Sequence, residues 1–137
     1  MSNSVSQDLY NIAGVAESLA PAARTTSASG TAIDLQGKES ALVVFHVGTW
    51  TDGTHTFTVQ ESDTTTDGDF ANAAAAALQG SAPTVTGADN DGLIAKVGYV
   101  GTKRYVRARC AITGSPSTGL VASACVVTGH ARHNPVS

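Results

Sequence analysis

One pattern repeats along the chain after Gly30: a short run rich in Thr and Val is followed by a turn of Gly, Asp, Asn or Pro. β-Branched side chains fit a pleated sheet better than a helix, and these turn residues permit sharp bends. Seven such runs lie at residues 31–35, 40–50, 54–62, 84–86, 93–100, 103–113 and 119–130. Short strands at this spacing predict an all-β fold, an antiparallel β-sandwich of jelly-roll-like form.

Two local features refine this prediction. The dipeptide Asp52-Gly53 lies between two strand runs and predicts a hairpin, because tight hairpin turns need a residue at positive φ. The alanine-rich run 70–78 follows Asp69 and precedes a glycine, as expected for a short helix with an N-terminal cap and a C-terminal stop. We therefore expect one short helix that closes one end of the sandwich.

The beginning of the chain differs in composition from the rest. Residues 1–29 are rich in Ser, Ala and Thr and show no sustained period of two or 3.6. We expect residues 1–29 to form an extended N-terminal arm and residues 30–137 to form the β-sandwich domain. The arm is expected either to be disordered or to lie across a neighbouring subunit. Its apolar anchors would then be Tyr10, Ile12, Val15 and Leu19.

The composition argues against several classes of protein. Aromatic residues make up only 5% of the 137 residues, so burial of large side chains contributes little to the stability of the core. We expect contact with a partner surface to stabilise the fold further. A net charge of −3 argues against direct binding to nucleic acid. No run approaches the ~18 apolar residues that span a membrane, and the first residues lack the pattern of a secretion signal. We expect a soluble homo-oligomer made in the cytoplasm.

Charges are segregated along the sequence. Seven acidic and no basic residues lie between positions 52 and 91, and six basic and no acidic residues lie between positions 96 and 132. In the run 103–113, small apolar residues alternate with Tyr105, Arg107 and Arg109, which places these three side chains on one face of a strand. That face is either solvated or partner-binding, since Arg and Tyr are enriched at interfaces. In the second case, an acidic loop of an identical subunit would pack head to tail against it.

The candidate partner-binding residues are therefore found in the arm and in this basic strand. They are Tyr10, Ile12, Tyr105, Arg107 and Arg109.

No catalytic signature is present in the sequence. Gly37-Lys38 is followed by Glu39 instead of Ser or Thr, which excludes a phosphate-binding P-loop, and no Gly-x-Ser-x-Gly elbow occurs. The acidic loops 61–69 and 89–92 lack the ligand spacing of a calcium loop and are interpreted as turns and caps. The four histidines are interpreted as surface or hydrogen-bonded residues: His46, His55, His130 and His133. We expect neither an enzyme nor a metal or cofactor site.

The two cysteines do not predict a disulfide. Cys110 and Cys125 lie in the last two strand runs, on either side of the loop 114–119, which is interpreted as a hairpin loop. In either register of that hairpin the two thiols lie on opposite faces or about 13 Å apart along the strand. Both are expected to be free, small, buried side chains.

Four segments, taken in order, resemble small structural proteins of tailed bacteriophages. They are GTWTDGTHTFTVQESD at 48–63, the run from DGDF to LQG at 67–80, GYVGTKRYVR at 98–107 and GHARHNP at 129–135. The length is similar to that of capsid decoration, or cement, proteins. The resemblance implies a β-rich virion protein on the outer capsid, where it clamps neighbouring major capsid protein subunits and has no catalytic residues.

Two alternatives remain open. One is a head–tail connector or tail-tube subunit, which would form a ring. The other is a carbohydrate-binding β-sandwich that uses Trp50, Tyr99 or Tyr105 as a stacking platform for sugars.

Overall fold

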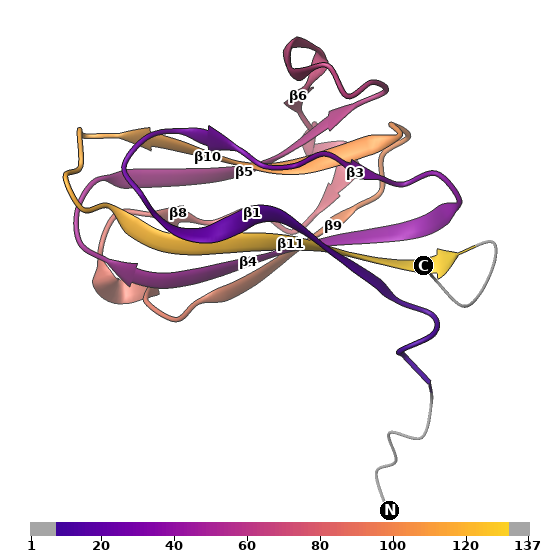
Figure 1. Cartoon of the computed structure of the whole chain (residues 1–137), viewed down its shortest axis with the longest axis horizontal. Helices are drawn as coiled ribbons and strands as arrows, with labels where there is room; N and C mark the ends of the chain where they lie inside the picture. Colours follow the sequence, from indigo (N-terminus) through magenta and orange to yellow (C-terminus); the bar gives the residue numbers. More distant parts are fainter. Residues whose placement is uncertain (1–7, 132–137) are drawn as a thin grey trace, which may run out of the picture.

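The computed structural model describes residues 8–131 and consists of two antiparallel β-sheets packed face to face (Figure 1). The first sheet, sheet A, contains, in spatial order, β1 (Gly14–Arg24), β11 (Leu120–Ala131), β4 (Lys38–Trp50), β9 (Ile94–Tyr99) and β7 (Leu78–Gln79). The prediction of an all-β sandwich is confirmed.

The second sheet, sheet B, is built on two long central strands, β10 (Tyr105–Thr113) and β5 (Thr54–Ser62). Its edges are interrupted. On the side away from β5, β10 pairs with two short strands, β2 (Ala28–Ser29) and β3 (Ile33–Asp34). On the side away from β10, β5 pairs with β6 (Ala71–Asn72) and β8 (Thr84–Val85). Three 3₁₀ turns complete the described elements: η1 (Asp67–Asp69), η2 (Ala75–Ala77) and η3 (Ala88–Asn90).

The core between the sheets is made mainly of valine and alanine. All but one of the side chains that β4 and β11 point inward are apolar and buried, the exception being the buried Thr128. Phe45 and Phe57 meet across the two layers with ring centroids 5.5 Å apart. Aromatic pairs in such tilted contact contribute about 0.5–1.5 kcal/mol beyond the area they bury. The inside–outside alternation expected in the run 103–113 is present, because Val106, Ala108 and Cys110 all face this core.

The chain joins the sandwich earlier than the sequence predicts. From Gly14 to Arg24 it pairs with β11, and Leu19 in this strand is only 2% exposed. The expectation of an arm over residues 1–29 is therefore wrong from Gly14 onward. Two register shifts interrupt β1, which removes the period of two that identifies a strand in a sequence.

Two turns that were predicted to form hairpins instead cross between the sheets. β4 belongs to sheet A and β5 to sheet B, so the Asp52-Gly53 turn joins layers, and the loop 114–119 does the same between β10 and β11. The carboxylate of Asp52 accepts N–H bonds from Ser117 (2.8 Å), Thr118 (3.2 Å) and Gly119, which holds the two crossing turns together. These bonds, from Gly119 first, lower the pKa of Asp52.

The predicted helix over residues 70–78 is also wrong. This run contains strand β6, the single 3₁₀ turn η2 and the start of strand β7. Isolated helices this short are marginal in water, and a run of alanines has no large side chain with which to hold one against a core. Its backbone groups pair instead with the edges of β5 in sheet B and β9 in sheet A. Asp69 accepts a hydrogen bond from the Thr64 hydroxyl (2.6 Å) and caps no helix.

The two cysteines are free, as predicted, for a reason that the sequence did not reveal. Cys110 lies in sheet B and faces the core, whereas Cys125 lies in sheet A, is half-buried and faces outward. Burial raises the pKa of the Cys110 thiol to about 11.

Candidate functional site

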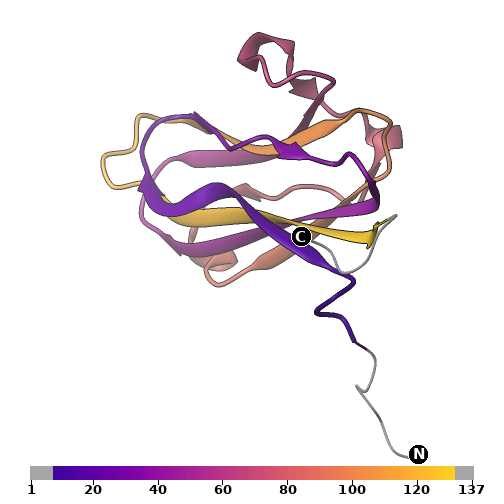
Figure 2. The same cartoon turned by 45° about the vertical axis from the view of Figure 1, so that its right-hand side comes forward.

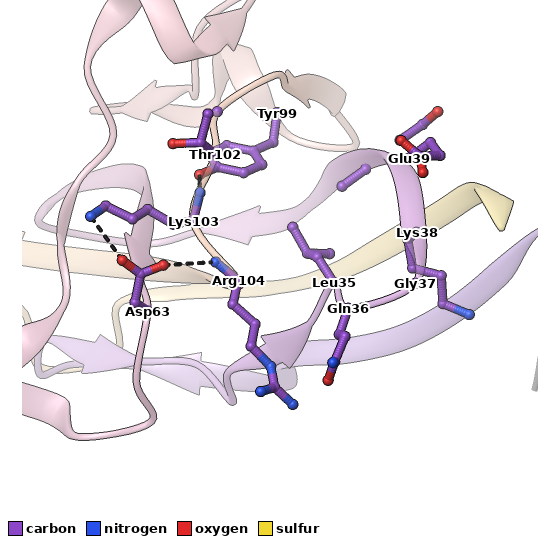
Figure 3. Close-up of a pocket in the computed structure, with 13 residues that line it drawn as sticks. Leu35, Gln36, Gly37, Lys38, Glu39, Asp63, Tyr99, Thr102, Lys103 and Arg104 are labelled. Carbon is purple, nitrogen blue, oxygen red and sulfur yellow. Dashed lines mark hydrogen bonds and ion pairs between the residues drawn. The ribbon is translucent and has the colours of Figure 1, made fainter. Parts of the chain in front are cut away.

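A polar cleft of about 350 Å³ opens at one end of the sandwich (Figure 3). One wall is the turn that leads from β3 into β4, and the other is the connection between β9 and β10. Asp63, which follows β5, and Tyr99, the last residue of β9, complete the lining.

Tyr99 is a buried side chain of this cleft that carries a titratable group. Its hydroxyl donates to Glu61 Oε1 (2.7 Å) and accepts the N–H of Lys103 (3.0 Å). Burial first, and the bond to Glu61 second, raise the pKa of Tyr99 to about 12. The phenol therefore keeps its proton near neutral pH, where it ties β5 to the β9–β10 connection.

Two of the cations that line this cleft are paired with carboxylates. Lys103 Nζ lies 3.1 Å from Asp63 Oδ2, and the Arg104 guanidinium binds both carboxylate oxygens of Asp34 (3.0 and 2.9 Å). These bonds lower the pKa of Asp63 and of Asp34. Ser40 also lines the cleft, and its Oγ contacts His130 Nδ1.

Arg107 was predicted to face a partner, but this chain covers it. Its side chain points out of sheet B, yet the residue is only 7% exposed. Its guanidinium donates to Gln60 Oε1 (2.8 Å) and to Asp67 Oδ1 (2.7 Å), and lies 4.1 Å from the centre of the Phe70 ring. The loop after β5 folds over Arg107 and uses it as an anchor.

The other two predicted residues of this face are also engaged within the chain. Arg109 Nη1 donates to Ser29 Oγ (2.7 Å), and the Tyr105 ring lies 5.0 Å beneath the Arg104 guanidinium. The prediction that Tyr105, Arg107 and Arg109 share a face is correct. The acidic segment pairs with the basic segment inside one molecule at two places, Asp63–Lys103 and Asp67–Arg107.

Tyr10 and Ile12 lie in the short segment that precedes β1. Tyr10 is 90% exposed, Leu9 is 68% exposed and Ile12 is 43% exposed. The segment is held in a turn because Asp8 accepts bonds from the Asn11 backbone N–H (3.0 Å) and side-chain amide (2.6 Å). Leu9 and Ile12 also line an apolar hollow of about 340 Å³ beside the ends of β4 and β11.

Sequence reasoning missed the outer face of sheet A. Its central strands point Leu42, Val44, Cys125 and Val127 outward, and its outer strands add exposed Val15 and Ile94. A signal was present, because residues 41–47 and 120–127 are almost continuously apolar, and such runs are typical of strands buried on both faces. In Figures 1 and 2, no second layer of the described chain lies over this face.

The three aromatic side chains considered as a sugar-binding platform, Trp50, Tyr99 and Tyr105, do not lie together. Trp50 and Tyr99 lie toward opposite ends of sheet A, because Tyr99 pairs with Ala41 near the start of β4 and Trp50 ends that strand. Tyr99 is buried, and Tyr105 lies on the outer face of sheet B. This dispersion argues against stacking of a sugar on these residues.

The histidines and acidic loops have separate places in the fold. His55 is buried and its Nε2 contacts the Asp52 carbonyl (2.9 Å), His46 is exposed on sheet A, and His130 contacts Ser40 Oγ. His133 lies outside the described residues. Asp91 accepts the Trp50 N–H (2.9 Å). Within residues 8–131, no group of three or more His, Cys, Asp or Glu could hold a metal ion.

None of the helices in the described part of the chain is both long and apolar enough to cross a membrane.

Comparisons with protein-family models, with curated proteins and with solved structures find no match for this chain.

Proposed function

We propose that this chain is a non-enzymatic structural protein of a tailed-phage virion, a decoration protein that binds the major capsid protein on the outside of the head. The observation that carries the proposal is the exposed apolar segment before β1, which leaves the sandwich body (Figures 1 and 2). Exposed apolar side chains gathered in one place favour binding to another protein surface.

The strand order supports the same proposal. We count β2 with β3, and β6 with β8, as single strands and leave aside the two-residue edge strand β7. Sheet A then has the order first, eighth, third and sixth strand, and sheet B has the order second, seventh, fourth and fifth. Nearly every connection therefore crosses between the sheets. We propose that the sandwich is a jelly roll, an architecture that recurs in viral capsid proteins. This likeness is one of architecture, and it supports the function less directly than the exposed segment does.

Binding would depend on many weak, identical contacts. Leu9, Tyr10 and Ile12 would pack against a capsid subunit, and complete burial of one such side chain contributes about 1.5–3 kcal/mol. A single copy would bind weakly once the entropy of association is subtracted. Copies that contact neighbouring capsid subunits would together stabilise the shell.

The experiment is cryo-electron microscopy of virions purified from the strain that encodes this chain. Density for the sandwich on the outside of the head is the expected result. Density in the tail would move the chain to the connector or tail-tube class, and virions that lack the chain would overturn the proposal.

A matched pair of substitutions tests the contact itself. Tyr10→Ser should lower the occupancy of the chain on virions, because it removes the most exposed aromatic ring of the segment. Val100→Ser is the control, since Val100 is also exposed and apolar but lies in the β9–β10 connection. Equal loss of occupancy for both variants would contradict the role of the segment.

A further inference from the structure

The outer face of sheet A has the composition of a contact surface. The two central strands point the half-buried Leu42, Val44, Cys125 and Val127 outward, together with exposed Val121 and the polar Ser123 and His46. On the flanking strands, Val15 and Ile94 are largely exposed. An open sheet face normally carries polar residues, as the outer face of sheet B does. A partner that covers this face would remove the apolar side chains from water.

The strand registers place these side chains in rows across the sheet. One row is Val15, Val127, Leu42 and Gly98; the next is Glu17, Cys125, Val44 and Lys96; a third is Ser123, His46 and Ile94. The first two rows cross all four long strands, and the third begins at β11, because a bulge in β1 leaves Ser123 without a partner there.

The middle row has opposite charges at its two ends. Glu17 on β1 and Lys96 on β9 are both exposed, and neither forms an ion pair with any described residue. They are three strand spacings apart, about 14 Å, which is too far for the two charges to pair within one molecule. Each charge therefore borders the apolar face without a partner.

We infer that this face binds a second copy of the chain, related by a two-fold axis that runs parallel to the strands between β11 and β4. Rotation about that axis places Glu17 of each copy opposite Lys96 of the other, so both ends of the middle row form ion pairs. A two-fold axis across the strands would instead place Glu17 opposite Glu17. Opposite charges at an interface select orientation in this way.

The same rotation matches the other rows. Val127 of one copy meets Leu42 of the other, and Ser123 meets His46. Ile94 reaches the bulged part of β1, which forms one side of a hollow of about 360 Å³; the hollow extends across the face to Val44, His46 and Ile94 itself. The exposed Ile94 of one copy therefore faces a recess that its counterpart in the other copy helps to line, and such a fit of surfaces is typical of interfaces.

The size of the face is close to what a dimer needs. The ladders across it contain eight pairs between β1 and β11, ten between β11 and β4 and six between β4 and β9. At ~3.3 Å per residue and ~4.8 Å per strand, the face is roughly 19 Å wide and about 20 to 33 Å long. That flat extent is somewhat below the ~800 Å² that each partner of a standard interface buries. The free edge of β1 is a poorer contact, because two bulges and Pro21 interrupt its backbone.

Charge reversal tests both the dimer and its axis. Glu17→Lys makes both ends of the row basic, and Lys96→Glu makes both ends acidic, so each variant alone places like charges at both contacts. Analytical ultracentrifugation at low salt should show that each raises the dimer dissociation constant about tenfold or more. An equimolar mixture of the two variants should form heterodimers close to the wild-type affinity, because every contact in the mixture joins opposite charges.

The mixture also controls for folding, since two misfolded variants would not restore each other. Asp89→Lys is the matched control: it reverses an exposed carboxylate outside this face and should leave the dissociation constant unchanged. A wild-type protein that is monomeric at about 100 μM, far above the Kd of typical stable interfaces, would overturn the inference. So would a mixture that fails to associate. Leu9 and Ile12 of the proposed capsid contact line one hollow with Leu42 and Val127 of this face, so the two surfaces adjoin. The tests remain separate, because occupancy on virions measures the capsid contact and ultracentrifugation of the purified chain measures the dimer.

Discussion

The two outward faces of this sandwich differ although they belong to the same fold. On sheet B, β5 points Thr54, Thr56, Thr58 and Gln60 outward beside Arg107 and Arg109 of β10, and these side chains meet water or the chain's own loop. On sheet A the corresponding positions are Leu42, Val44, Cys125 and Val127. A strand that is open on one face but does not alternate between polar and apolar residues therefore indicates a surface for a partner.

The largest expected effect is a weaker dimer after a carboxylate is placed on the outer face of sheet A. The same change on the outer face of sheet B is the control. Val44→Glu and Thr58→Glu each put a carboxylate on a central strand, opposite a basic residue of the neighbouring strand: Lys96 for Val44 and Arg109 for Thr58. We expect Val44→Glu to raise the dimer dissociation constant about 100-fold or more, because the two-fold axis buries two carboxylates in one interface. Thr58→Glu should leave it unchanged.

Sedimentation equilibrium over a concentration series measures both constants. A dimer that tolerates Val44→Glu and is lost with Thr58→Glu would place the interface on the outer face of sheet B and leave that of sheet A in solvent.

The second-largest expected effect is a loss of stability caused by a substitution on the outer face of sheet B. Arg107→Ala removes the anchor of the loop after β5, leaves Gln60 Oε1 without its donor and uncovers the Phe70 ring. We expect a loss of about 1–3 kcal/mol in the free energy of unfolding, as for other buried polar groups that lose a partner. Lys96→Ala on sheet A is the matched control and should have little effect on a monomer, since Lys96 is exposed and unpaired among the described residues.

Urea unfolding at low protein concentration measures this difference, and hydrogen exchange should show faster exchange in residues 63–72 of Arg107→Ala. Equal stability of Arg107→Ala and the wild type would mean that the loop does not depend on this cation.

The difference between the faces also explains which parts of the fold could be predicted from the sequence. β5 was predicted with its observed bounds, because its apolar and polar residues alternate between a core and a wet face. β1 was missed because its bulges break that alternation. The apolar face of sheet A was missed for the opposite reason: its near-continuous apolar runs were read only as strands, with no question about their second face.

Long-range contacts account for the remaining errors. The Asp52-Gly53 turn has the residues of a hairpin, but its carboxylate binds the backbone of Ser117 and Gly119 in another loop, and that contact directs the next strand into the other sheet. Arg107 has the alternation of an exposed residue, and only the folding of Asp67 and Phe70 over it makes it buried. Local sequence does not encode either contact.

A smaller effect is expected from acid. The pKa of Asp34 lies below its ordinary value of 3.8, mainly because of the bond from Arg104, and that of Asp63 is lowered by Lys103. A carboxyl group with a lowered pKa stabilises the fold above its unfolded-state pKa and loses this contribution as the pH falls through the folded-state pKa. Stability should therefore decline from about pH 5 downward.

Asp34→Asn should lose stability at neutral pH and converge with the wild type in acid, whereas Asp89→Asn, at an exposed carboxylate, should follow the wild type throughout. Thermal unfolding between neutral pH and strong acid gives these curves. A constant gap between Asp34→Asn and the wild type at all pH values would show that the pair with Arg104 does not contribute to acid sensitivity.

The smallest effect is the protection of one thiol. Cys125 faces outward on sheet A and is half-buried, whereas Cys110 faces the core and burial raises its pKa to about 11. The thiolate is the form that reacts, so a maleimide at neutral pH should label Cys125 first and Cys110 only upon unfolding.

In the inferred dimer, Cys125 of each copy lies opposite Val44 of the other, and its labelling should slow several-fold as protein concentration rises. Lys96→Glu should abolish that dependence on concentration, because it dissociates the dimer and lies two strands away from Cys125, whereas Glu17 is the cross-strand neighbour of Cys125. Labelling that slows equally in Lys96→Glu would mean that Cys125 is protected by something other than a second copy in this orientation.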